Sequence, residues 1–278
     1  MTEQQREYEY ETGLCLSGGG ALGFAHIGAL QALCEHGVRP EFISGASVGA
    51  IIGVLFAEGY APDDIFHLSE DYKLYDLFHI VKTTTSSLRS RGISRHDKIK
   101  RMLYELIPHD SFDLLKTRFC VSVVDICKPD WEIVGHGGNL IGHVLASMSV
   151  PLVFVPEVIG HKVYVDGGVM NNLPVEPLRG ECRRVIGIDV QDIGEVPNVT
   201  DKTHMLKRYY GAMMKQIQRP RVALCDHYVS FPELEKFAVS DFRKYKEIYQ
   251  IGYDVTSRYL DAHPIGRSGA TVCRGADR

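Results

Sequence analysis

Short apolar runs alternate with longer segments of helical periodicity in the first half of the chain. Strand-like runs occur near residues 13–17, 41–46, 119–125, 131–135, 162–165 and 184–190. An apolar helical segment follows each of the first two runs, and a strand-helix-strand-helix opening is typical of a parallel sheet. The pattern predicts an α/β fold with three layers, α/β/α, around a mainly parallel central sheet.

Two later segments have the periodicity of amphipathic helices. Ser94 and Asp97 have the spacing of a capping box, and the helix that follows, residues 96–107, places on one face Ile99, Met102, Leu103 and Leu106. A longer helix is predicted over residues 240–260, beginning at Ser240 as the N-cap. Its regularly spaced aromatic residues indicate a face that packs on the core.

Ser47 follows the second predicted strand and precedes an apolar helix. It stands in Gly45-Ala46-Ser47-Val48-Gly49, a G-x-S-x-G sequence in the strand-turn-helix context of a nucleophile elbow. Gly45 and Gly49 permit a tight turn that presents the hydroxyl at the N-terminus of the helix. Small residues also allow a helix to pack closely on a sheet, so a purely structural role is the alternative for this pentapeptide.

Three consecutive glycines, Gly18, Gly19 and Gly20, separate the first predicted strand from a helix, with Gly23 close behind. Their N–H groups can hold an anion at the positive end of the helix dipole. A dinucleotide site would need an acidic residue at the end of the second strand, but Glu41 stands at its beginning, and no P-loop sequence occurs. The oxyanion of a tetrahedral intermediate is therefore favoured over a nucleotide, which stays open as an alternative.

Asp166 closes the predicted strand at residues 162–165 and is followed by Gly167 and Gly168. An acid at the carboxyl end of a strand occupies the position where the active sites of α/β proteins lie. Asp-Gly is also an ordinary turn sequence. The presence of three strand-end motifs in one chain favours an active site.

In this order, the glycine-rich segment 18–23, the elbow 45–49 and Asp166-Gly167-Gly168 resemble motifs of the patatin-like phospholipase family. Residues 146–156 and 172–175 are also similar to the family. The resemblance implies a Ser47/Asp166 dyad with Asp166 as the base, and an oxyanion hole formed by the N–H groups of Gly18, Gly19 and Gly20. Leu22 stands where many members carry Arg or Lys, so the sequence provides no charged side chain to assist these donors.

The resemblance covers residues 12–190, which we expect to form a patatin-like catalytic core. Residues 191–264 are expected to form a helical extension packed on the same domain, and residues 1–11 and 265–278 flexible tails. The helix at 96–107 is expected to dock on the core, with a cap over an acyl-chain groove as the alternative. Candidates to line the entrance of such a groove are Leu77, Phe78, Ile80 and Val81.

An unperturbed aspartate is a weak base for a serine hydroxyl, because its pKa is about 3.9. Exclusion of water raises that pKa, and stabilisation of the oxyanion lets attack and proton transfer proceed together. The 12 histidines of the chain keep a serine-histidine-acid triad open as an alternative. His26 is better explained by packing on the first helix, and His136, His143 and His161 lie near turns outside any catalytic motif.

Composition favours one large α/β domain without a nucleic-acid partner. The chain has 278 residues, 45% of them hydrophobic, and a net charge of -4, which provides no overall basic field. Local basic runs at residues 98–101 and 215–221 are typical of solvated helix faces, with weak contact to anionic lipid head groups as the alternative. Oligomeric state is not indicated.

The chain start is polar and acidic, and the longest apolar run, residues 42–57, is interrupted and shorter than the about 20 residues that span a bilayer. Seven cysteines occur without a C-x-x-C pair, which favours reduced thiols over a zinc site. We therefore expect a cytoplasmic protein, with any membrane contact peripheral.

These features together predict a serine acyl-ester hydrolase of the lipase or phospholipase A type. Ser47 would form an acyl-enzyme, Asp166 would pass the proton to the leaving alcohol, and water would release the fatty acid. No cofactor or metal is required. A lipid-binding or regulatory protein of the same fold with little turnover is the alternative.

Overall fold

The computed structural model describes residues 7–72, 97–151, 153–192, 194, 198–199 and 201–266. The candidate entrance residues at 77–81 and Ser94 of the predicted capping box lie outside these ranges. So do residues 1–6 and 267–278 of the predicted tails.

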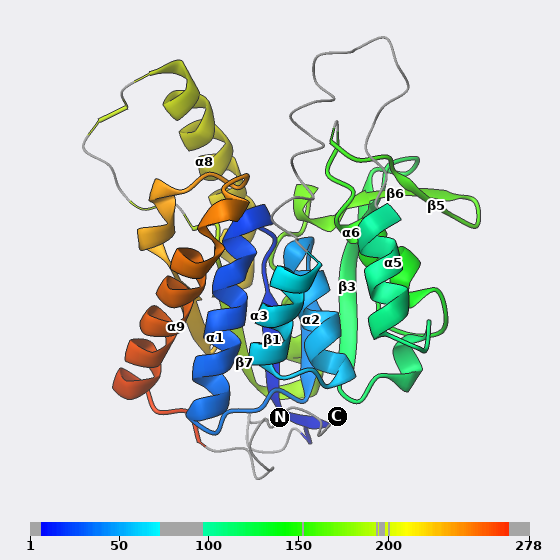
Figure 1. Ribbon diagram of the computed structural model, residues 1–278, viewed down its shortest axis with the longest axis horizontal. Helices are drawn as coiled ribbons and strands as arrows, with labels where there is room; N and C mark the ends of the chain where they lie inside the picture. Colours follow the sequence, from blue (N-terminus) through cyan, green and yellow to red (C-terminus); the bar gives the residue numbers. More distant parts are fainter. Residues whose placement is uncertain are drawn as a thin grey trace.

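A twisted sheet forms the centre of the described structure (Figure 1). Its strand order is β5-β6-β3-β2-β1-β7-β8, and β4 pairs with β3 outside this path. The strands are β1 (Tyr10–Leu16), β2 (Phe42–Gly45), β3 (Arg118–Asp125), β4 (Asp130–Val134), β5 (Glu157–Ile159), β6 (Lys162–Asp166), β7 (Cys182–Asp189) and β8 (His227–Ser230). The pairs from β3 through β2, β1 and β7 to β8 are parallel, whereas β4, β5 and β6 pair antiparallel.

Helices cover both faces of this sheet, which confirms the three-layer α/β/α prediction. On β1, Leu14 and Leu16 belong to one buried apolar cluster, while Cys15 between them belongs to another, because successive side chains of a strand point to opposite faces. The helices are α1 (Phe24–Glu35), α2 (Val48–Glu58), α3 (Pro62–Asp71), α5 (Asp97–Leu106), α6 (Leu140–Ser147), α7 (Glu176–Glu181), α8 (Lys202–Val222) and α9 (Tyr245–Ala262).

The first cluster holds together α1, α2, α3 and α9, which lie side by side over one face in Figure 1. Close contact of α1 with α9 depends on Gly28 and Gly252, since a Cβ on either would collide with the backbone of the other helix. α7 packs on the opposite face, where Leu178 joins Cys15 in the second cluster. Parallel strands are therefore buried on both sides, as their nearly continuous apolar sequences require.

The C-terminal segment is less purely helical than expected. β8 extends the sheet beside β7, and α9 begins after Lys244 instead of Ser240, because a short 3-10 turn at Phe242–Lys244 precedes it. Ordered structure also reaches the inner ends of both ranges expected to be tails, since β1 begins at Tyr10 and Ile265 is buried.

The ranges given above contain neither a helix that could span a membrane nor a cluster of side chains that could hold a metal ion. No helix there combines the length and apolar character needed to cross a bilayer. Nor do three or more His, Cys, Asp or Glu side chains gather there as a metal site would require. Free thiols in the same ranges are those of Cys15, Cys120, Cys127, Cys182 and Cys225, whereas Cys34 is disulfide-bonded, contrary to the expectation of reduced thiols.

Candidate active site

Ser47 occupies the turn between β2 and α2. Its backbone has φ 52 and ψ −124, a positive φ that is uncommon outside glycine and costs on the order of 1–3 kcal/mol. The turn is tight because Gly45 and Gly49 lack side chains: a Cβ on Gly45 would lie 2.7 Å from the Gly49 carbonyl oxygen, and one on Gly49 would collide with that of Leu16. The Ser47 N–H donates to Ser147 Oγ at 2.9 Å, which anchors the strained turn to α6.

Asp166 ends β6, and only 4% of its surface is exposed. Its carboxylate accepts a hydrogen bond of 2.7 Å from the Gly168 N–H and also interacts with the Ser47 side chain. Burial raises the pKa of Asp166 to about 7, although both of these interactions act in the opposite direction. The carboxyl group therefore has the basicity of a general base that works near neutral pH.

The register of the sheet places Ser47 level with Asp166. Gly45 pairs with Val121 of β3 in the parallel direction, so Ser47, two residues further on, stands at the height of Val123. Asp166 is paired with Val123 from the antiparallel side. The serine and the aspartate thus meet at one height from β2 and β6, which flank β3.

This arrangement differs from the one that the sequence suggested for Asp166. The prediction relied on the carboxyl ends of parallel strands meeting at one edge of the sheet. β6 runs antiparallel to β3, so its carboxyl end points away from that edge. Asp166 reaches the site because of the pairing register and not because of strand direction.

The three glycines proposed as oxyanion donors are not equivalent in the structure. The Gly18 N–H donates to the backbone and side-chain oxygens of Asn172, at 3.3 and 3.1 Å. The N–H groups of Gly19 and Gly20 have no acceptor among the described residues, and both glycines line the cavity that contains Ser47. Two of the three predicted donors are therefore available, and the third helps to hold the loop.

Asn172 is a polar residue for which the sequence alone indicated no role. It is 2% exposed, and besides receiving the Gly18 N–H it donates through Nδ2 to Gln191 Oε1 at 3.1 Å. These bonds tie the loop after Asp166 to the loops after β1 and β7. Its position six residues after Asp166, among mostly apolar neighbours, was the available signal.

The remaining motif glycines keep the three loops close together. Gly23, directly before α1, lies against Val48 of α2, and Gly167 lies against the Ser122 carbonyl of β3; a Cβ at either position would collide with its neighbour. Gly168 lines the cavity beside Asp166. The motif positions therefore lack room for side chains.

An apolar cavity of about 680 Å³ opens from Ser47 and Asp166 into the space between the helices. Its walls come from several helices and include Ile27, Leu55, Ile65, Ile99, Met102 and Phe242. Ile99 and Met102 of α5 are buried, so that helix docks on the core, as favoured from the sequence, and also forms part of the cavity wall. Ser47 itself is only 8% exposed.

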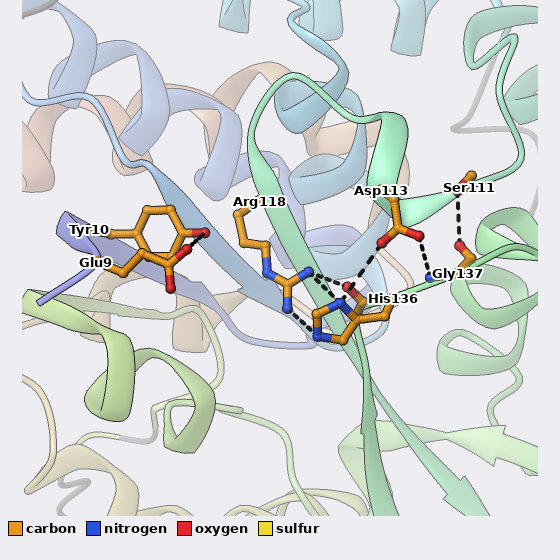
Figure 2. Close-up of polar contacts among 8 residues, drawn as sticks. Glu9, Tyr10, Ser111, Asp113, Arg118, His136 and Gly137 are labelled. Carbon is orange, nitrogen blue, oxygen red and sulfur yellow. Dashed lines mark hydrogen bonds and ion pairs between the residues drawn. The ribbon is translucent and has the colours of Figure 1, made fainter.

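Within the part of the chain that the structure describes, no histidine lines this cavity. His26 is buried with Nε2 2.8 Å from the Ser17 carbonyl oxygen, and burial lowers its pKa to about 4. His143 contacts a backbone carbonyl through Nδ1, and His136 lies against the Arg118 guanidinium at the start of β3 (Figure 2). The described histidines therefore offer no support for a triad.

Comparison with known proteins identifies relatives of this chain. A Caenorhabditis elegans protein described as a patatin-like phospholipase domain-containing protein is 30% identical over 86% of this chain and 20% of its own length. The lysophospholipase NTE1 of Saccharomyces cerevisiae is 24% identical over 89% of this chain and 16% of its own length. The chain thus spans only a small part of these relatives.

A similar fold occurs in the crystal structure of VipD from Legionella pneumophila. The TM-score is 0.56 at 18% identity, and the match covers 95% of this chain and 72% of that one. The family model described as patatin-like phospholipase matches residues 14–179. Because that range is more than half of the chain and contains the Gly18 loop, the Ser47 elbow and Asp166, this protein belongs to the patatin-like phospholipase family.

Proposed function

We propose that the protein hydrolyses carboxylic esters of lipids through an acyl-enzyme formed on Ser47, with Asp166 as the base. The observation that carries this proposal is the interaction of a strained serine with a buried aspartate of raised pKa, both at the wall of one apolar cavity. The cavity volume, about 680 Å³, lies within the range of small-molecule sites. Its apolar lining suits an acyl chain.

In the first half of the reaction, Ser47 Oγ attacks the ester carbonyl carbon while its proton moves to the Asp166 carboxylate. The negative charge that develops on the carbonyl oxygen is stabilised by the N–H groups of Gly19 and Gly20. When the tetrahedral intermediate collapses, the ester C–O bond breaks and Asp166 returns the proton to the leaving alcohol.

In the second half, a water molecule gives a proton to Asp166 and attacks the acyl carbon of the acyl-enzyme. The bond to Ser47 Oγ then breaks, Oγ recovers a proton from Asp166, and the carboxylic acid leaves. Leu22 lines the cavity and carries no charge, so the loop supplies only backbone donors. The similarity to the lysophospholipase NTE1 of Saccharomyces cerevisiae supports lysophospholipids as the first natural substrates to test.

A series of p-nitrophenyl esters tests this proposal. We expect turnover, with kcat/KM rising by up to about fourfold per added CH₂ group as the acyl chain fills the cavity, because each buried CH₂ contributes about 0.8 kcal/mol. Rates are measured at ester concentrations too low for the ester to aggregate. Folded protein that neither turns over these esters nor reacts with a fluorophosphonate would instead support the lipid-binding alternative.

The pH dependence of kcat/KM follows from the ionisation of Asp166. The base must be deprotonated, and its pKa is about 7, so we expect kcat/KM to fall as the pH drops through about 7 and to level off above it. Stopped assays with one ester over a range of buffers give this profile. If kcat/KM instead fell only at a pH near the ordinary pKa of an aspartate, which is about 3.9, the result would contradict a buried Asp166 as the base.

Gly19→Val tests the oxyanion loop. A Cβ at Gly19 would lie 2.5 Å from Val190 Cγ2, so the loop must shift and carry its N–H donors with it. We expect kcat to fall by about 10²–10³, as for the loss of an oxyanion-hole donor.

Gly180→Val provides the matched control for that substitution, because no neighbouring atom lies within 4 Å of a Cβ at Gly180. We expect its kcat to be that of the wild type. A Gly19→Val protein that is folded and has wild-type kcat would show that the oxyanion is stabilised elsewhere.

A further inference from the structure

α8 presents an apolar stripe to solvent. Its members are between 48% and 67% exposed: Met205, Leu206, Tyr209, Tyr210 and Met213. Their spacing of three and four residues places them on one side of the helix. Large exposed apolar surfaces of this kind mark sites of contact with a protein or a membrane.

The stripe adjoins the mouth of the catalytic cavity. Tyr210 belongs both to the stripe and to the cavity lining, and so connects the two. Three further exposed apolar residues also line the cavity, namely Val150, Val169 and Val239. In Figure 1, α8 projects from the end of the molecule opposite the start of β1 and the C-terminal end of α9. The exposed apolar surface is therefore continuous, through these residues, with the lining of the cavity that contains Ser47.

The charge of α8 is opposite to that of the whole chain. Residues 202–222 contain six Lys and Arg residues and no Asp or Glu, whereas the chain carries a net charge of -4. Three of these cations, Arg208, Lys215 and Arg221, form ion pairs with residues outside the helix. Lys202 and Arg219 are exposed and have no ion-pair partner in the described ranges.

At about 100° per residue, Lys202 falls within the arc of the stripe, at its N-terminal end, and Arg219 borders that arc on the side of Met205. Lys202 precedes Leu206 by four residues, and Gln216 and Arg219 continue the same spacing beyond Met213. A helix with an exposed apolar side bordered by Lys and Arg is the type that lies in the interface of an anionic bilayer.

We propose that α8 docks the protein on an anionic phospholipid bilayer, with the apolar stripe among the head groups and with Lys202 and Arg219 against lipid phosphates. The proposal rests on the proposed function to the extent that the docked surface delivers the substrate. A second copy of the chain is a poorer occupant, because pairing of two such helices would bring like charges together and cover both cavity mouths.

Sedimentation with vesicles tests the docking, and Ser47→Ala protein is used so that the lipid is not consumed. One set of vesicles contains phosphatidylcholine with phosphatidylglycerol, and the other contains phosphatidylcholine alone. We expect binding to the anionic vesicles to be at least about tenfold stronger, and to weaken as salt is added. Absence of binding to the anionic vesicles would overturn the proposal.

Leu206→Glu/Met213→Glu replaces two stripe residues that do not line the cavity. In the Ser47→Ala background, we expect these changes to lower anionic-vesicle binding at least about tenfold, since two apolar side chains lose their burial. Leu114→Glu is the matched control, because Leu114 is 60% exposed, close to the 67% of Leu206, but lies in the turn next to the C-terminal end of α2. Ser47→Ala protein that also carries Leu114→Glu should bind the anionic vesicles as strongly as Ser47→Ala protein does.

The double substitution Lys202→Gln/Arg219→Gln separates the contribution of charge to vesicle binding from the contribution of apolar insertion. About fivefold weaker anionic-vesicle binding is expected for each charge removed, together with a smaller salt dependence. Equal binding by the parent and the Leu206→Glu/Met213→Glu protein would overturn the proposal. The proposal would also be overturned if the Ser47→Ala protein were a dimer that Leu206→Glu/Met213→Glu converts to a monomer without altering vesicle binding.

The same double substitution in the active protein should leave hydrolysis of a soluble p-nitrophenyl ester unchanged. Vesicle binding is measured with Ser47→Ala protein, so failure of the hydrolase proposal would not remove that readout. Conversely, if the protein is an active esterase but Leu206→Glu/Met213→Glu leaves its vesicle binding unchanged, the docking proposal is refuted and the hydrolase proposal is not.

Discussion

Ser47→Ala lowers kcat for p-nitrophenyl esters by about 10⁴ or more and removes fluorophosphonate labelling, if Ser47 is the nucleophile. The reason is that Oγ forms the covalent bond of the acyl-enzyme, and alanine has no atom to replace it. Alanine adopts the same backbone with the same strain, so circular dichroism and the melting temperature should change little. Mass spectrometry of the labelled wild type should place the adduct on the peptide that contains Ser47.

Ser69→Ala is the matched control for this substitution. Ser69 lines the same cavity and is buried, but its hydroxyl donates to the Phe66 carbonyl within α3. We expect labelling and kcat close to those of the wild type. Labelling of Ser47→Ala protein at wild-type rate would show that another residue is the nucleophile and would refute the proposed dyad.

Asp166→Asn has the second large effect, a fall in kcat of about 10³–10⁴, comparable to that of other catalytic Asp→Asn changes. The amide has nearly the shape of the carboxyl group, and its oxygen can still accept the Gly168 N–H. It cannot accept the Ser47 proton at neutral pH. The measurement is kcat against pH, and the decline as the pH drops through about 7 should disappear in the variant.

The same substitution has an expected effect on stability with a defined sign. The folded-state pKa of Asp166 is about 7, above its unfolded value, so the fold favours the protonated carboxyl group. This contribution is fully present at a pH below the unfolded pKa and is lost as the pH rises through about 7. Thermal melting should therefore show Asp166→Asn gaining stability relative to the wild type from about pH 4 to above pH 7.

Asp125→Asn is the control for both effects. Asp125 ends β3, is 6% exposed and accepts the N–H of the residue two positions later, as Asp166 does, but it does not line the cavity. Its kcat should stay close to that of the wild type. An Asp166→Asn protein that retains substantial activity would require a different base, and the histidines would then be re-examined as candidates.

The sequence predicted the fold class because the central strands are buried on both faces. Such strands appear as apolar runs, as β1, β2, β3 and β7 do. The other two predicted strands correspond to β6 and to the partly exposed β4. β5 and β8 were not predicted, since they have three and four residues and are partly exposed. Short edge strands of this kind are defined by pairing with a neighbour, which a local pattern does not reveal.

In the oxyanion loop, too, the local sequence features were predicted whereas the contacts between distant residues were not. Its glycines were evident from the sequence, as was their position between a strand and a helix. The different roles of Gly18 and Gly19 depend on Asn172, which lies 154 residues from Gly18 in the chain. The apolar stripe of α8 likewise became visible only when the structure showed which side of that helix is covered.

The sequence by itself determined the family, the α/β class and the three motifs, because glycines at strand ends and apolar runs are local features. The tertiary structure decided how those motifs meet. Asp166 lies on an antiparallel strand, and the pairing of Val123 with Asp166 and of Val121 with Gly45 brings it level with Ser47. Burial of the carboxyl group, which raises its pKa to about 7, is likewise a property of the packed chain, since it depends on the exclusion of water by residues distant in sequence.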